Sequence, residues 1–86
     1  MQIGVFDSGI GGEAIAATLR AAFPDATVRC INDCANLPYG DKDQSTIITL
    51  TDRALQPLLA QHCNVIVIAC NTATAAAIDT LRIRYP

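Results

Sequence analysis

The chain has 86 residues, of which 51% are hydrophobic and 16% charged, and its net charge is −2. This length fits one small globular unit, the charge provides no basic patch for nucleic acid, and no apolar run approaches the roughly 20 residues that span a bilayer. A chain of this size buries only roughly 60% of the surface that its unfolded form exposes, which favours a partner or further sequence.

The N-terminus and the cysteines indicate the compartment. Met1 leads directly into an apolar strand pattern, without the basic start and small-residue cleavage site of a secretory signal. The cysteines form no CxxC pair, and His62 is not spaced with them as a zinc ligand. We therefore expect a cytoplasmic protein with reduced thiols, no metal site and no membrane partner. The four cysteines are Cys30, Cys34, Cys63 and Cys70.

The first predicted unit is a strand, a glycine-rich loop and a helix. The strand spans residues 3–6, and the loop that follows has three glycines in four positions, which allows backbone to approach a ligand closely. Apolar residues at i, i+4, i+7 and i+8 then indicate one face of a helix that ends before Pro24. These positions are Ile15, Leu19, Ala22 and Phe23.

The second predicted unit contains a long connection. A strand at residues 27–31 is followed by 12 residues, from 33 to 44, before the next helical pattern begins. Usual strand-to-helix loops have 2–6 residues, and excess length of this kind is often functional, although a long surface turn is the simpler interpretation. We expect Ser45 to cap the helix, and Pro57 to cause a kink or a non-helical last turn.

The third predicted unit places Cys70 between a strand and a helix. The strand spans residues 65–68, and the helix runs from about Thr72 toward Tyr85, with Ile78 and Leu81 on the same face as Tyr85. The positive end of a helix favours an anion, so a thiolate at this position is stabilised and becomes a candidate base or nucleophile. The alternative is that Cys70 is a small apolar residue packed under a turn.

The βαβαβα order predicts an α/β fold, a three-layer unit with a parallel sheet and right-handed crossovers. The carboxyl ends of parallel strands share one edge, where open α/β sheets bind ligands. Three loops therefore meet in one crevice at this edge. His62 and Cys63 precede the third strand, so we expect them at the opposite edge, in a structural or surface role. The loops carry Asp7 and Ser8, residues 33–40, and Cys70 with Asn71 and Thr72.

A dinucleotide site is one interpretation of the glycine-rich loop. Gly9, Gly11 and Ala14 fit the G-x-G-x-x-G/A spacing, and Asp33 lies where an acid that binds ribose is expected. The signal is weak, because the negative charge of Asp7 beside the loop opposes a second anion.

A small amino acid suits the same crevice better. Backbone N–H groups of the loop can hold a carboxylate, Asp7 can pair with an ammonium group, and Ser8 can donate or accept a hydrogen bond. We expect Asn71 and Thr72 to add polar contacts beside Cys70, and Tyr39 to close over the ligand.

The chemistry of Cys70 is either attack on a carbonyl or removal of an α-proton. A cysteine hydrolase needs a histidine base, and His62 is at the wrong end of the sheet. Proton transfer needs only the thiolate, with Asp7 near enough to tune it. Racemisation then requires a second acid on the opposite face of the α-carbon.

Three stretches resemble the glutamate racemases of the aspartate/glutamate racemase superfamily. Residues 3–12, IGVFDSGIGG, resemble the opening of that family, and Ala69-Cys70-Asn71-Thr72-Ala73 resembles its A-C-N-T-A signature. Asp33, Ala35, Pro38-Tyr39-Gly40 and Lys42 resemble its D-x-A-x-x-P-Y-G-x-K stretch. Departures are Glu13, where the family usually has an apolar residue, and Cys34, where it usually has threonine or serine.

The resemblance implies cofactor-independent interconversion of L- and D-glutamate by two cysteines, which supplies D-glutamate for bacterial peptidoglycan. By this resemblance Cys70 would be the first cysteine of that pair, and Asp7 aligns with an acid that assists it. The substrate-binding positions that the resemblance implies are Asp7, Ser8, Tyr39, Gly40, Asn71 and Thr72.

The family is more than twice as long and has two similar halves, so we expect residues 1–86 to be a truncated N-terminal half-domain that ends within the first half, with the second half absent. The second cysteine of the family, in a G-C-T-H motif, has no counterpart here. Cys34 is a poor substitute because it lies on the same side of the crevice as Cys70. Alternatives are an aspartate racemase, a decarboxylase or isomerase of the superfamily, and an inert folding or interaction unit that associates through an open sheet edge. Association of the chain into a homo-oligomer is a further possibility.

Overall fold

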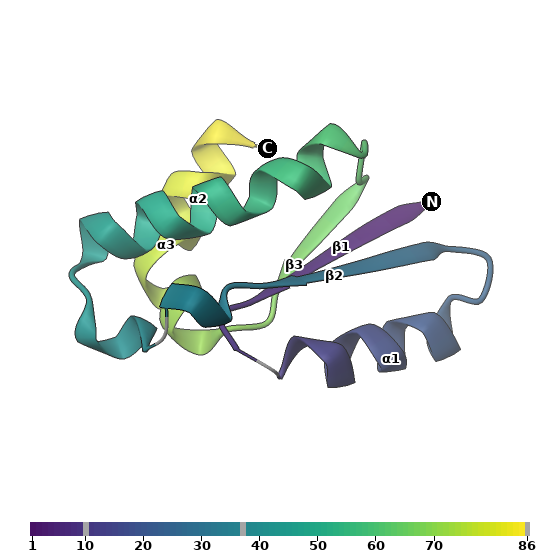
Figure 1. The fold of residues 1–86 in the computed structure, drawn as a ribbon. Helices are drawn as coiled ribbons and strands as arrows, with labels where there is room; N and C mark the ends of the chain where they lie inside the picture. Colours follow the sequence, from purple (N-terminus) through teal and green to yellow (C-terminus); the bar gives the residue numbers. More distant parts are fainter. Residues whose placement is uncertain (10, 37, 86) are drawn as a thin grey trace.

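The computed structural model describes residues 1–9, 11–36 and 38–85. Ile10, Leu37 and Pro86, which belong to stretches discussed above, lie outside the described residues. Three strands, β1 (Gln2–Asp7), β2 (Thr27–Asn32) and β3 (Val65–Ile68), form one parallel sheet in the order β2-β1-β3 (Figure 1). The predicted α/β class and parallel sheet are confirmed.

Strand β1 lies at the centre of the sheet because its side chains are apolar on both faces. Ile3, Val5 and Phe6 are all buried, as expected of a central strand in a parallel sheet. Asp7 pairs in register with the last residue of β2, and Phe6 pairs with the last residue of β3. The three carboxyl ends therefore lie side by side at one edge.

Helices cover both faces of the sheet and complete the three layers. Helix α1 (Gly12–Ala22) packs on one face, and α2 (Gln44–Ala60) and α3 (Asn71–Arg84) pack together on the other (Figure 1). Residues of β1 and β2 form one buried cluster with Ala16 of α1, and a larger cluster lies under α2 and α3. No helix in the described part of the chain is long and apolar enough to cross a membrane.

The buried face of α1 differs from the face that the apolar spacing indicated. Ile15 and Phe23 are exposed, whereas Gly12 and Ala16 are buried. The physical reason is close approach: a Cβ atom on Gly12 would lie 2.9 Å from Cβ of Asp7, so only small residues fit where α1 meets β1. Of the residues that the spacing indicated, Leu19 is half-buried and packs against the core cluster, whereas Ile15 and Phe23 remain exposed.

The start of α2 corrects the predicted cap. Asp43, not Ser45, is the N-cap, because its extended backbone lets its carboxylate accept a hydrogen bond from Thr46 N at 2.8 Å. Ser45 lies inside the first turn. Of the two outcomes expected at Pro57, a non-helical last turn does not occur, since α2 remains helical to Ala60.

Replacing Asp43 by alanine is expected to lower Tm by a few degrees, whereas Ser45→Ala, the matched control, leaves Tm nearly unchanged. The hydrogen bonds from Thr46 lower the pKa of Asp43 in the folded chain. Because this pKa is lowered on folding, the ionised carboxylate stabilises the folded chain at pH values above the unfolded pKa, near 3.8. That contribution is lost as the pH falls through the pKa of the folded state. Thermal melts followed by circular dichroism therefore should show the difference between Asp43→Ala and the parent shrinking on acidification. An equal effect of both substitutions at neutral pH would contradict the assignment.

Candidate functional site

Cys70 is the N-cap of helix α3 and follows strand β3 directly. Its backbone is extended, and its Sγ accepts a hydrogen bond from Ala73 N at 3.4 Å. Ala73 is fully buried, so the first turn of the helix packs closely against the sheet. The thiol thus occupies the position at which a helix terminus stabilises negative charge, as the sequence predicted.

Ser8 crosses from the end of β1 to the thiol of Cys70. The two side chains, Ser8 Oγ and Cys70 Sγ, are 3.1 Å apart and either atom can be the donor. Both residues are only 8% exposed, as is Asp7. The ends of β1 and β3 therefore bring Ser8 and Cys70 into contact, and Asp7, the last residue of β1, is buried next to Ser8 in the sequence.

Both carboxylate oxygens of Asp7 accept hydrogen bonds from backbone N–H groups that follow it in the chain. Oδ1 accepts from Ser8 N at 2.8 Å, and Oδ2 accepts from Gly12 N at 2.9 Å. The N-cap of α1, Gly11, has no side chain to cap the helix, so the Asp7 carboxylate takes that place from the end of β1. The Gly12 N–H group is consequently occupied, which weighs against the loop as a holder for an external carboxylate or phosphate.

Tyr39 belongs to the loop that follows β2, and its side chain packs into the core. That loop contains two short 3₁₀ turns, η1 (Cys34–Asn36) and η2 (Tyr39–Asp41). The Tyr39 side chain is 2% exposed, and its ring centroid lies 6.3 Å from that of Phe6. In this conformation the ring is part of the core.

Asp33 holds the Tyr39 hydroxyl in place. Tyr39 Oη donates to Asp33 Oδ2 at 2.6 Å, Asn36 Nδ2 donates to Oδ1 at 2.8 Å, and the Asp33 N–H donates to the Asp7 carbonyl at 3.1 Å. Burial, followed by the bond to Asp33, raises the pKa of Tyr39 above its usual range, so its hydroxyl remains a donor. From the sequence, Asp33 was considered as a ribose ligand and as part of the stretch that resembles the racemases, and its contact with Tyr39 was not predicted. Its place directly after β2 was the available signal.

The remaining predicted residues meet at the surface of the same edge. Gly40, Asn71 and Thr72 line one open hollow, together with Gln44, Ile47, Ala75 and Ala76. A Cβ atom on Gly40 would meet nothing within 4 Å, so the backbone is accessible there. The edge thus has a buried acid, hydroxyl and thiol, and an exposed rim that carries amide and hydroxyl groups.

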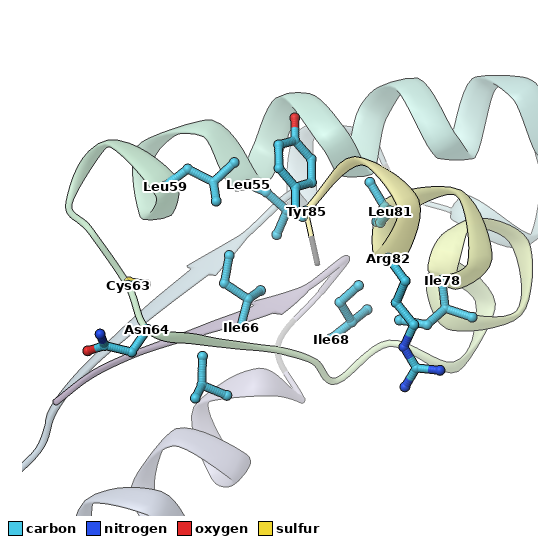
Figure 2. A pocket seen from close by; sticks show the side chains of 11 residues that line it. Leu55, Leu59, Cys63, Asn64, Ile66, Ile68, Ile78, Leu81, Arg82 and Tyr85 are labelled. Carbon is cyan, nitrogen blue, oxygen red and sulfur yellow. The ribbon is translucent and has the colours of Figure 1, made fainter.

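A second hollow, of about 500 Å³, lies along β3 beneath α2 and α3, and most of the side chains that line it are apolar. Figure 2 shows Leu55 and Leu59 of α2, Ile66 and Ile68 of β3, and Tyr85 beyond α3 around it. Cys63 and Asn64, which precede β3, also line it, and Asn64 N bonds to the carbonyl of Gln2 at the start of β1. The predicted placement of His62 and Cys63 at the edge opposite Cys70 is confirmed.

Comparisons with known proteins agree with this arrangement, although no protein-family model matches the chain. The chain is 44% identical over 85 residues to a glutamate racemase of Lachnospira eligens, and 44% identical over 84 residues to a glutamate racemase of Pseudomonas aeruginosa. These matches cover 99% and 98% of this chain and 32% of each relative.

A solved structure, the glutamate racemase from Aquifex pyrophilus, matches with a TM-score of 0.91 at 35% identity, over 96% of this chain and 33% of that one. The chain spans about one third of the length of the curated relatives that it matches. The sequence and structure alignments each cover nearly the whole chain, and the chain is therefore a homologue of the glutamate racemases that corresponds to about one third of their length.

Proposed function

We propose that this chain is the Cys70-bearing part of a cofactor-independent glutamate racemase. The observation that carries the proposal is the buried Cys70 thiol, capping α3 and 3.1 Å from Ser8 Oγ, at the edge where all three strands end. The similarity to glutamate racemases over 99% of the chain supports it.

In the proposed reaction the Cys70 thiolate removes the α-proton of glutamate. The C–H bond breaks, an S–H bond forms, and the electron pair stays on the α-carbon until an acid on the opposite face returns a proton. Gly40, Asn71 and Thr72 line the hollow at this edge and would bind the polar groups of the substrate. Asp7, Ser8 and Tyr39 would complete the binding side from beneath that rim.

The proposal includes the place of the chain in a longer protein. Residues 1–86 would form part of the N-terminal half, and a second half would supply the opposing thiol. The complete protein would act in the cytoplasm and supply D-glutamate for peptidoglycan.

On its own, the 86-residue chain is expected to show negligible racemisation of glutamate, because the acid that inverts the α-carbon must approach from the other face. The measurement is exchange of the glutamate α-proton in D₂O, followed by NMR with the purified chain. Exchange at ordinary racemase rates would contradict the proposal that this chain supplies only one face of the active site.

A chimera tests the function itself. The matching third of the Lachnospira eligens racemase is replaced by this chain, and circular dichroism of L- and D-glutamate mixtures reports racemisation. A folded, active chimera supports the proposal, whereas a folded chimera without activity contradicts it. Turnover of aspartate in preference to glutamate would favour the aspartate racemase alternative.

An interaction unit is the second candidate, because the edge of β3 is open. Within the described residues β3 pairs only with β1, and Val65 is 44% exposed beside the apolar hollow of Figure 2. An open apolar edge strand is a template for pairing with another chain. Light scattering over a range of concentrations distinguishes the candidates, since a strict monomer argues against association through this edge.

A further inference from the structure

The neighbouring residues Asp7 and Ser8 direct their side chains to different partners. Both Asp7 oxygens accept from backbone N–H groups, one from Ser8 and one from Gly12 at the start of α1. The Ser8 hydroxyl instead meets the Cys70 sulfur, 62 positions later in the sequence. The side chain in contact with the thiol is therefore the hydroxyl and not the carboxylate.

The protonation state of Cys70 decides the direction of this hydrogen bond. A thiol can donate to Ser8 Oγ or accept from it, whereas a thiolate has no proton and can only accept. When Cys70 loses its proton, the Ser8 hydroxyl must be the donor in this hydrogen bond. The other donor, Ala73 N, is farther from the sulfur, at 3.4 Å.

We propose that Ser8 is a positioning residue that orients the Cys70 sulfur and stabilises its thiolate, while Asp7 acts on the loop and on α1. The role in catalysis rests on the proposed function, in which this thiolate is the base. Ser8 and Cys70 are both nearly buried, so water cannot replace a missing hydroxyl without rearrangement. A hydrogen bond to a charged acceptor in such surroundings is roughly twice as strong as one between neutral groups.

The experiment measures the rate at which iodoacetamide alkylates Cys70 as a function of pH, in the 86-residue chain and in Ser8→Ala. Mass spectrometry of proteolytic peptides separates Cys70 from the other three cysteines. In Ser8→Ala the midpoint of the pH–rate profile is expected to move up by about one pH unit. The rate near neutral pH then falls about threefold, because the less stabilised thiolate is also the stronger nucleophile.

Ser8→Thr is the matched variant, since it keeps the hydroxyl, and its midpoint should stay near that of the parent chain. Asp7→Asn should lower Tm through the loss of the charge at the start of α1, without an upward shift of the midpoint. Two results would overturn the proposal: an unchanged midpoint in Ser8→Ala with only the plateau rate altered, or an upward shift in Asp7→Asn as large as in Ser8→Ala. Racemisation is not read in this assay, so failure of the proposed function appears separately, in the chimera.

Discussion

Replacing Cys70 by alanine in the chimera is expected to lower racemisation of glutamate by roughly 10²–10⁴-fold, the usual contribution of a positioned general base. In the proposed reaction the thiolate accepts the α-proton, and the hydrogen-bond partners of the sulfur are Ser8 Oγ and Ala73 N. Circular dichroism of the amino-acid mixture measures the rate, and circular dichroism of the protein verifies the fold.

Cys34→Ser is the matched control for that substitution. Cys34 is exposed in η1, after β2, and it belongs to the same edge as Cys70. Because inversion requires groups on opposite faces of the α-carbon, this substitution should leave racemisation within about twofold of the parent. Loss of activity in Cys34→Ser, or its retention in Cys70→Ala, would reject the assignment of the base.

Replacing Phe6 by alanine is expected to destabilise the chain by about 3–5 kcal/mol, the usual cost of removing a fully buried aromatic side chain. Phe6 is 0% exposed in the central strand, and its ring packs against that of Tyr39. Domains of this length have a free energy of unfolding of about 4–13 kcal/mol, so the substitution removes a large share of it. Urea unfolding followed by circular dichroism gives the two free energies.

Phe23→Ala provides the control with the same chemical change at an exposed site. The Phe23 side chain is 52% exposed at the C-cap of α1, and its loss should cost no more than about 0.5 kcal/mol. A difference of less than about 1 kcal/mol between Phe6→Ala and Phe23→Ala would mean that the larger core cluster is not where the stability of the chain lies.

The order of the elements was readable from the sequence because each is signalled locally. The apolar run at residues 65–68 and the alternation of strand and helix patterns are properties of short windows. The cap of α2 was misassigned because Asp43 and Ser45 are both good capping residues. Only the extended backbone at Asp43 distinguishes them.

Strand order and packing distances were not readable in that way. The position of β1 between β2 and β3 depends on which strands bury both faces, and the exposure of Ile15 depends on how closely α1 approaches Asp7. Helical periodicity identifies a face of a helix, but it does not say which of two neighbouring faces meets the sheet.

By itself, the sequence determined the α/β class, the edge at which the loops meet, and Cys70 as the candidate base at that edge. It could do so because parallel strands place their carboxyl ends at one edge of the sheet. Only the tertiary structure decided the partner of each side chain. It paired Ser8 with the thiol, turned Asp7 to the start of α1, and placed Asp33 under Tyr39. Ser8 and Cys70 are 62 residues apart, so their contact follows from the packing of distant segments, which no local pattern encodes. The Asp7 and Asp33 contacts join residues only five and six positions apart, and they depend on the conformation of the loops that follow β1 and β2.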